Sequence, residues 1–392
     1  MKHITAHQWS VLSGVILLGP ALRLLPRLPA QYAARSCWLA ALTALPLLLL
    51  YALLLSRLWE NRPEGTGFAE LTVQILGPAA ARPVLVLFAA WFLFYGGFLL
   101  RAGGDRLVVT IYPHSSSTPF VLSMGLVCLF AALGSARSLA RTAKLVRPLI
   151  YGVLLLLLLF SLKGVDRGNL LPVTVYDLPA LTRAARPVLD VLGLGLFLPL
   201  FFLGYVRQGG ARLPRYVRWL FGQTMLLTLL MLAVVGNFSA ALVTELTHPF
   251  FTLVRNLVFF RSLERLEALV VSCWIFPDFL LVSLCLYAAQ LCLRTALGEQ
   301  PLQDEGAHLR FDRRRWLIPL CGAVCILIGL LLAPDLMSLR RLSESVIPGI
   351  NLAVCYLSPP LLLLAEKLLP RLRAQPPKLF RRRPRPFPDG NG

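Results

Sequence analysis

The sequence predicts an all-α membrane protein of about ten transmembrane helices, arranged as inverted five-helix repeats in which helices 1 and 6 are broken. Ten long apolar stretches fill the 392 residues, of which 57% are hydrophobic and only 15% charged, whereas soluble proteins carry about 25% charged residues. The first stretch contains Gly19-Pro20 and Pro26. Lipid offers no partner for loose backbone groups, so an interrupted span needs protein or water around the break.

The apolar stretches are each long enough to cross roughly 30 Å of hydrocarbon, which takes about 20 residues. We expect the first stretch to remain in the protein, because no small-residue cleavage site follows it. A single transmembrane permease-like domain is predicted over residues 1–370. The spans are predicted at residues 8–25, 36–58, 83–112, 118–136, 145–163, 187–206, 216–245, 266–297, 315–333 and 345–369.

The net charge of +20 is explained by the positive-inside rule. If the N-terminus is cytoplasmic, 25 of the 39 Lys and Arg residues fall in cytoplasmic segments. An even number of spans then leaves both termini in the cytoplasm. Residues 371–392 form a basic Pro/Arg-rich cytoplasmic tail that we expect to be disordered. Its run Arg381-Arg382-Arg383 is expected to rest on anionic lipid headgroups, and no nucleic-acid partner is predicted.

Helix-weakening residues recur at the start of each predicted half. The first span carries Gly19-Pro20, and the sixth carries Gly193-Leu194-Gly195 and Pro199. Within a helix Gly costs about 1 kcal/mol and Pro about 3 kcal/mol. Matching breaks in the two halves of a repeat indicate a ligand site near the midplane of the bilayer. The alternative is that Gly and Pro are simply common in membrane helices.

Ionisable residues inside spans are expensive and are therefore candidates for function. Arg23 and Asp190 lie beside the two predicted breaks, and we expect them to pair across a central cavity. Arg101 in the third span and Asp278 in the eighth form a second candidate pair. The alternative is that these side chains extend to the membrane interface from helix ends. For Asp278, ten residues into its stretch, packing or ligand contact is favoured.

The chemistry expected at the break is binding of an anionic group by freed N–H groups, and of an ammonium group or a cation by unwound carbonyls. Freed N–H groups at a half-helix N-terminus attract an anionic group such as an amino-acid carboxylate, and aromatic residues of the third span either line the pocket or pack ordinarily. The predicted ligand-binding residues are Gly19, Pro20, Ala21, Leu22, Trp91, Phe94, Tyr95, Gly193, Leu194, Gly195 and Asp278.

Enzyme and metal signals are missing from the sequence. It contains no nucleophile elbow, P-loop or GxGxxG motif. All eight cysteines fall within or at the edge of apolar spans without a zinc-binding spacing, which is typical of cysteine packed as a small hydrophobic residue. We therefore predict that the chain is not an enzyme and uses no metal or cofactor.

An ordered set of short motifs runs along the chain. Together these motifs resemble the spore germination permease family, the membrane-embedded B subunit of nutrient germinant receptors, itself similar to the amino acid–polyamine–organocation transporter superfamily. They are Ile4-Thr5-Ala6-His7-Gln8, Cys37-Trp38-Leu39, Phe68-Ala69-Glu70 and Ile75-Leu76-Gly77 in the second loop, Leu100-Arg101 with Asp105, Thr118-Pro119, Gly134 with Ala140-Arg141, Asn169-Leu170-Leu171-Pro172-Val173, Glu264-Arg265-Leu266 and Trp274-Ile275.

This resemblance implies a ten-helix fold with a central pocket for a small nutrient, often an amino acid. It also implies a complex with receptor A and C subunits in the spore inner membrane. The chain departs from the family where Gly195 stands in place of a frequent Glu, and near Gly134, where Ala136 and Arg137 stand where a Glu is usual. Three hypotheses follow: a nutrient-sensing receptor subunit, an amino-acid transporter of the same fold, and a purely structural membrane subunit.

Overall fold

The computed structural model describes residues 4–60, 62, 66–112, 114–206, 212–256, 267–298, 316–333 and 335–368, apart from the side chains of 267–270, 272 and 336. The predicted tail at 371–392 lies outside these residues. The described chain is built of helices joined by turns, with an isolated parallel bridge between Ile4 and Val206. Its α-helices are α1 (Ala6–Val15), α2 (Leu18–Leu24), α3 (Arg27–Ala33), α4 (Ala40–Leu58), α5 (Phe68–Thr110), α6 (Thr118–Leu133), α7 (Ala136–Ser161), α8 (Leu178–Phe197), α9 (Leu213–Glu245), α10 (Pro249–Asn256), α12 (Glu267–Ala296), α13 (Leu317–Leu331), α14 (Leu336–Arg341) and α15 (Ile347–Leu368).

The helices have the length and surface of membrane spans. Within the described residues, seven helical segments are long and apolar enough to cross a membrane, and α6 and α13 are shorter apolar helices. Large apolar side chains point outward, including Phe130 at 79% and Leu145 at 78% exposure. Extended apolar surface of this kind suits lipid, so the predicted all-α membrane fold is confirmed. The count of ten spans and the inverted repeat stay predictions.

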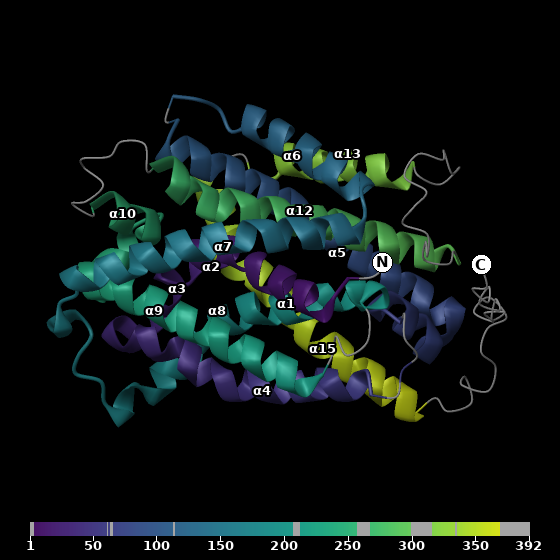
Figure 1. Cartoon of the computed structure of the whole chain (residues 1–392), viewed down its shortest axis with the longest axis horizontal. Coiled ribbons are helices and arrows are strands. Elements are labelled where there is room, and N and C mark those ends of the chain that lie inside the picture. Colours follow the sequence, from purple (N-terminus) through teal and green to yellow (C-terminus); the bar gives the residue numbers. More distant parts are fainter. Residues whose placement is uncertain are drawn as a thin grey trace, which may run out of the picture.

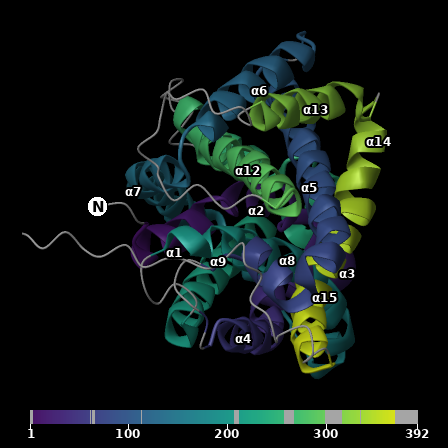
Figure 2. The same ribbon diagram turned by 90° about the vertical axis from the view of Figure 1, so that its right-hand side faces the viewer.

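The N-terminal helices lie inside the bundle. In Figures 1 and 2, α1 and α2 lie between a layer that contains α5 and α12 and a second group of helices that contains α4, α8 and α9. The shorter helices α6 and α13 lie outside α5 and α12 (Figure 1). The first span is therefore surrounded by protein, which is the environment that an interrupted membrane helix requires.

The first span is interrupted twice, once at the predicted Pro26 and once before the predicted Gly19-Pro20. It starts at a capping box in which Thr5 and Gln8 exchange side-chain-to-backbone hydrogen bonds. The helix is interrupted at Ile16-Leu17 and again at Leu25-Pro26. Gly19-Pro20, the predicted break, instead lies in the first turn of α2, where the missing N–H of proline is tolerated. Pro26 does mark the second interruption.

The sixth span changes conformation after its glycines rather than at them. α8 continues through Gly193-Leu194-Gly195 to Phe197, and a 3-10 helix follows from Leu198 to Tyr205. The indole N–H of Trp9 on α1 donates a 2.9 Å hydrogen bond to the carbonyl oxygen of Pro199. A carbonyl at the predicted break is thus satisfied by the first span, so the two spans are joined at this point.

Two long helices bend at residues with positive φ. In α5 the bend is at Gly77, with φ 77°, immediately before Pro78. The segment Phe68–Leu76, expected as a loop, is helical and largely buried. In α9 the bend is at Ser239, with φ 66°, a conformation that is uncommon for a residue other than glycine.

Candidate functional site

A buried ion pair joins α5 to α12 in the core. An Nη of Arg106 lies 3.3 Å from Oδ2 of Asp278, and both side chains are almost fully buried. The predicted partner of Asp278 was Arg101, and this prediction is wrong. Arg101 instead pairs with Asp105 one turn further along α5, with Nε and Oδ2 at 3.1 Å. Arg106, which no motif singled out, is the residue that faces α12.

The carboxylate of Asp278 lies directly against α2. A Cβ atom built on Gly19 would come within 1.9 Å of Oδ1 of Asp278. Only glycine allows the backbone and the carboxylate to approach so closely. Oδ1 is buried and has no hydrogen-bond partner among the described residues. The position at which a ligand's anion was expected is therefore occupied by an anion of the protein itself.

Two arginines lie over aromatic rings beside this carboxylate. Arg23, one turn after Gly19 on α2, lies with its guanidinium carbon 5.0 Å from the ring centre of Phe98, and Arg106 lies 5.6 Å from that of Trp274. The Nε atoms of both arginines are buried and have no hydrogen-bond partner in the described part of the chain. Cation–π contacts thus replace some of the hydrogen bonds that a buried guanidinium needs.

A histidine outside the spans has its pKa lowered, mainly by burial and secondarily by these two arginines. His248 lies in the loop between α9 and α10. Burial, followed by the guanidinium groups of Arg106 and Arg23, lowers the pKa of His248 to about 3. His248 is therefore neutral at physiological pH and adds no charge beside Arg23 and Arg106.

Asp190 on α8 brings a second buried carboxylate to the same region. The structure has no ion pair between Asp190 and Arg23, both of which it describes, so that predicted pair is wrong. Asn351 of α15 lies close enough to Asp190 to interact with it electrostatically, but Oδ1 of Asp190 and Oδ1 of Asn351 have no hydrogen-bond partner among the described atoms. Tyr95 of α5 lies among the charges of Asp190, Arg23 and Asp278. Hereafter, the charge cluster denotes Arg23, Tyr95, Arg106, Asp190, Asp278 and Asn351.

The glycines of the sixth span serve close packing. A Cβ on Gly193 would meet the ring of Tyr356 at 2.6 Å, and one on Gly195 would meet Leu17 at 2.5 Å. The hydroxyl of Tyr356 donates a 2.9 Å hydrogen bond to the carbonyl of Leu189. The space beside these glycines is filled by side chains of the protein, and a glutamate at position 195 would have to displace Leu17.

The other predicted contacts are packed into the core. Pro20, Ala21 and Leu22 are buried on α2, and Leu194 is buried on α8. Trp91 lies with its ring centre 5.9 Å from Tyr95 and 5.8 Å from Phe94 along α5. Of these three aromatic residues, Tyr95 is the one that meets the charges of the cluster.

A cavity of about 250 Å³ reaches Asp278 from another side than expected. Residues of α5, α6 and α12 line it, including Gly103, Leu107, Phe120 and Trp274. These helices correspond to the third, fourth and eighth predicted spans, whereas the sequence placed the pocket between the first, third, sixth and eighth. The lining is apolar, and Asp278 supplies the only carboxylate among the described lining residues.

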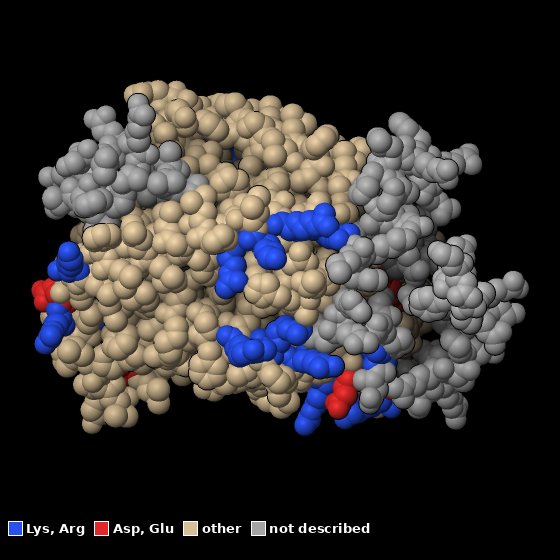
Figure 3. Space-filling view, viewed as in Figure 1, with Lys and Arg blue, Asp and Glu red and all other residues tan. Residues whose placement is uncertain are grey.

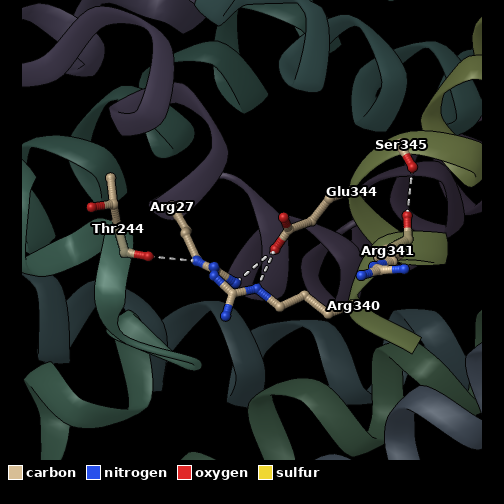
Figure 4. A network of polar contacts seen from close by, with 6 residues as sticks. All are labelled: Arg27, Thr244, Arg340, Arg341, Glu344 and Ser345. Carbon is tan, nitrogen blue, oxygen red and sulfur yellow. Dashed lines mark hydrogen bonds and ion pairs between the residues drawn. The ribbon is translucent and has the colours of Figure 1, made fainter. Parts of the chain in front are cut away.

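A separate polar network joins the C-terminal part of α9 to α3 and to the start of the last span. Figure 4 shows the guanidinium groups of Arg27 and Arg340 directed at the carboxylate of Glu344, at 2.7 and 3.0 Å. Nε of Arg27 also donates a 2.9 Å bond to the carbonyl of Thr244. Glu344 lies in a π-helical turn, Leu342–Val346, a feature often found at functional sites.

Replacing Glu344 by glutamine is expected to lower the free energy of unfolding by about 2 kcal/mol, because Arg27 is buried and loses its charged acceptor. Arg340→Gln removes the outer arginine, whose side chain is 38% exposed, and is expected to cost less than about 1 kcal/mol. The unfolding midpoints of both variants in detergent measure the difference. Equal midpoints would show that the Arg27–Glu344 contact does not hold these helices together.

The comparisons with known proteins identify one family. A family model for spore germination proteins, the spore permeases, matches residues 3–335. That range contains every member of the charge cluster except Asn351. No curated protein matches the chain.

Proposed function

The chain belongs to the spore germination protein family, and on that premise we propose that it is the membrane subunit of a nutrient-germinant receptor. In this proposal a small nutrient, most simply an amino acid, binds at the charge cluster, and binding triggers germination. The receptor A and C subunits are its proposed partners. The spore inner membrane is its proposed location, with both termini cytoplasmic as the distribution of Lys and Arg indicates.

The observation that carries the proposal is the set of unpaired charged atoms in the core. Oδ1 of Asp278 and Oδ1 of Asp190 lack donors, and Nε of Arg23 lacks an acceptor, within the described residues. Buried polar groups normally have partners, so these atoms are suited to a ligand. An α-amino acid carries an ammonium group for a carboxylate and a carboxylate for a guanidinium. The apolar cavity beside Asp278 suits its side chain.

Signalling requires that the nutrient bind one conformation better than another. The charge cluster draws on α2, α5, α8, α12 and α15. A ligand that neutralises these charges would stabilise the arrangement of helices that brings them together. The same construction also suits a transporter, and uptake of labelled amino acid into proteoliposomes distinguishes that alternative.

Spores that lack this gene are expected to lose their response to one class of nutrient, and the restored gene should return it. Germination against a panel of amino acids, sugars and nucleosides is followed by loss of optical density. An unchanged response across the panel would argue against the receptor, and proteoliposome uptake would then test the transporter.

Within the restored strain, Asp190→Asn keeps the size of the side chain and removes its charge. We expect the nutrient concentration for half-maximal germination to rise about tenfold, the effect of losing one charge-assisted hydrogen bond. Asp166→Asn, in an exposed loop, serves as the matched control and should respond normally. A normal response of Asp190→Asn at normal abundance would remove Asp190 from the site.

A further inference from the structure

A second cavity, of about 400 Å³, lies between α1, α7 and α9, away from the charge cluster. It is lined by one face of each helix: His7, Ser10 and Gly14 from α1, Arg147 and Tyr151 from α7, and a longer run from α9. The α9 residues are Arg215, Arg218, Trp219, Gly222 and Gln223. The volume falls within the range of about 300–1,000 Å³ that is usual for small-molecule sites.

The polar groups around this cavity favour an anion. Three guanidinium groups line it, from Arg147, Arg215 and Arg218, and none of the described lining residues is acidic. Figure 3 shows Lys and Arg side chains gathered in two groups on this face, over the N-terminal parts of α7 and α9. Arginine presents paired donors that match the oxygens of a phosphate group.

A buried donor points independently to a ligand. Trp219 is only 9% exposed, and its indole N–H has no hydrogen-bond partner among the described residues. Gly14 leaves room beside it, since a Cβ there would lie 2.9 Å from the Tyr151 hydroxyl and 3.0 Å from Nε2 of Gln223. Nε2 of Gln223 donates to the Tyr151 hydroxyl at 3.1 Å. The floor of the cavity is thus a set of polar groups that glycine keeps accessible.

The position of the cavity along the spans is consistent with the membrane surface. Its arginines lie at the starts of the fifth and seventh predicted spans, and His7 precedes the first. In the predicted topology these three spans all begin on the same side of the membrane. Basic pockets between transmembrane helices on the cytoplasmic side bind anionic headgroups. We propose that this cavity binds a phosphate group, supplied either by an anionic phospholipid or by a soluble phosphate compound. The site is independent of the proposed nutrient site.

Purified full-length protein in neutral detergent is titrated with inorganic phosphate at constant ionic strength, and the unfolding midpoint gives the apparent affinity. In parallel, the midpoint is compared in nanodiscs of phosphatidylglycerol and of phosphatidylcholine. A response to inorganic phosphate identifies a soluble source. A higher midpoint in phosphatidylglycerol than in phosphatidylcholine, without any response to inorganic phosphate, identifies the lipid as the source. No response to either probe overturns the proposal.

Single substitutions test whether the phosphate binds in this cavity. Arg147→Gln and Arg218→Gln, both at exposed positions that tolerate the change, are each expected to weaken binding about tenfold. Trp219→Phe keeps the ring and removes the N–H, with an expected loss of about fivefold. Arg141→Gln removes an exposed charge from the same helix α7 outside the lining and should change binding less than twofold, as expected for a distant, screened charge. Equal losses in Arg141→Gln and Arg147→Gln would show diffuse surface attraction and overturn the site.

Discussion

Replacing Gly19 by alanine is expected to abolish the nutrient response and to lower the free energy of unfolding by about 3 kcal/mol, at the upper end of the usual cost of overpacking. The added Cβ would lie 1.9 Å from Oδ1 of Asp278, so either α2 or the carboxylate must move. The carboxylate cannot move without disturbing its ion pair with Arg106, because both side chains are buried. A local change in α2 is therefore transmitted to α5 and α12.

The measurement combines germination with an immunoblot of the spore membrane fraction. We expect the Gly19→Ala protein to enter the membrane, since the substitution leaves the apolar spans intact. Gly152→Ala on α7 is the matched control, because a Cβ there meets nothing within 4 Å. A normal nutrient response of the Gly19→Ala spores would refute the close approach of α2 to Asp278.

The second large effect is expected at the ion pair itself. Asp278→Asn leaves the buried guanidinium of Arg106 without a counter-charge, which costs about 3–5 kcal/mol in buried pairs. The double variant Asp278→Asn/Arg106→Gln removes both charges and is expected to recover most of that loss. Unfolding in detergent measures Asp278→Asn, Arg106→Gln and the double variant as a double-mutant cycle. We expect the nutrient response to be absent in the double variant even though its stability is restored.

The pair Arg101–Asp105 provides the matched control for this cycle. It lies on the same helix, at 3.1 Å, but both side chains are partly exposed. Its removal is expected to cost about 0.5 kcal/mol. If the single losses at Asp278 and Arg106 simply added in the double variant, the two side chains would not be coupled, and the ion pair would play no part in the site.

The choice between Arg101 and Arg106 illustrates the limit of sequence reasoning. Both arginines lie in the same span, and each has an aspartate that it could reach. Five residues apart on an α-helix, they point in directions about 140° apart. Which of them faces α12 depends on the rotation of α5 within the bundle, and this rotation is determined by packing along the whole helix.

The glycines of the first and sixth spans also show what sequence reasoning could not decide. Gly19, Gly193 and Gly195 were interpreted as helix breakers from their intrinsic propensity. In the structure all three lie within helices and allow close contact, with Asp278, Tyr356 and Leu17 respectively. The sequence contains no signal that separates a glycine at a break from a glycine at a contact, because the contacting atom comes from a distant part of the chain.

The sequence by itself determined that this is an all-α membrane protein, because its apolar stretches are long enough to cross the bilayer as helices, which pair their own backbone polar groups away from water. It also identified Arg23, Asp190 and Asp278 as candidates, since charges are rarely tolerated at such depth. Only the tertiary structure decided their partners, the places where the helices are interrupted and which helices enclose the cavity at Asp278. These depend on how helices pack, and packing is decided by contacts between residues hundreds of positions apart.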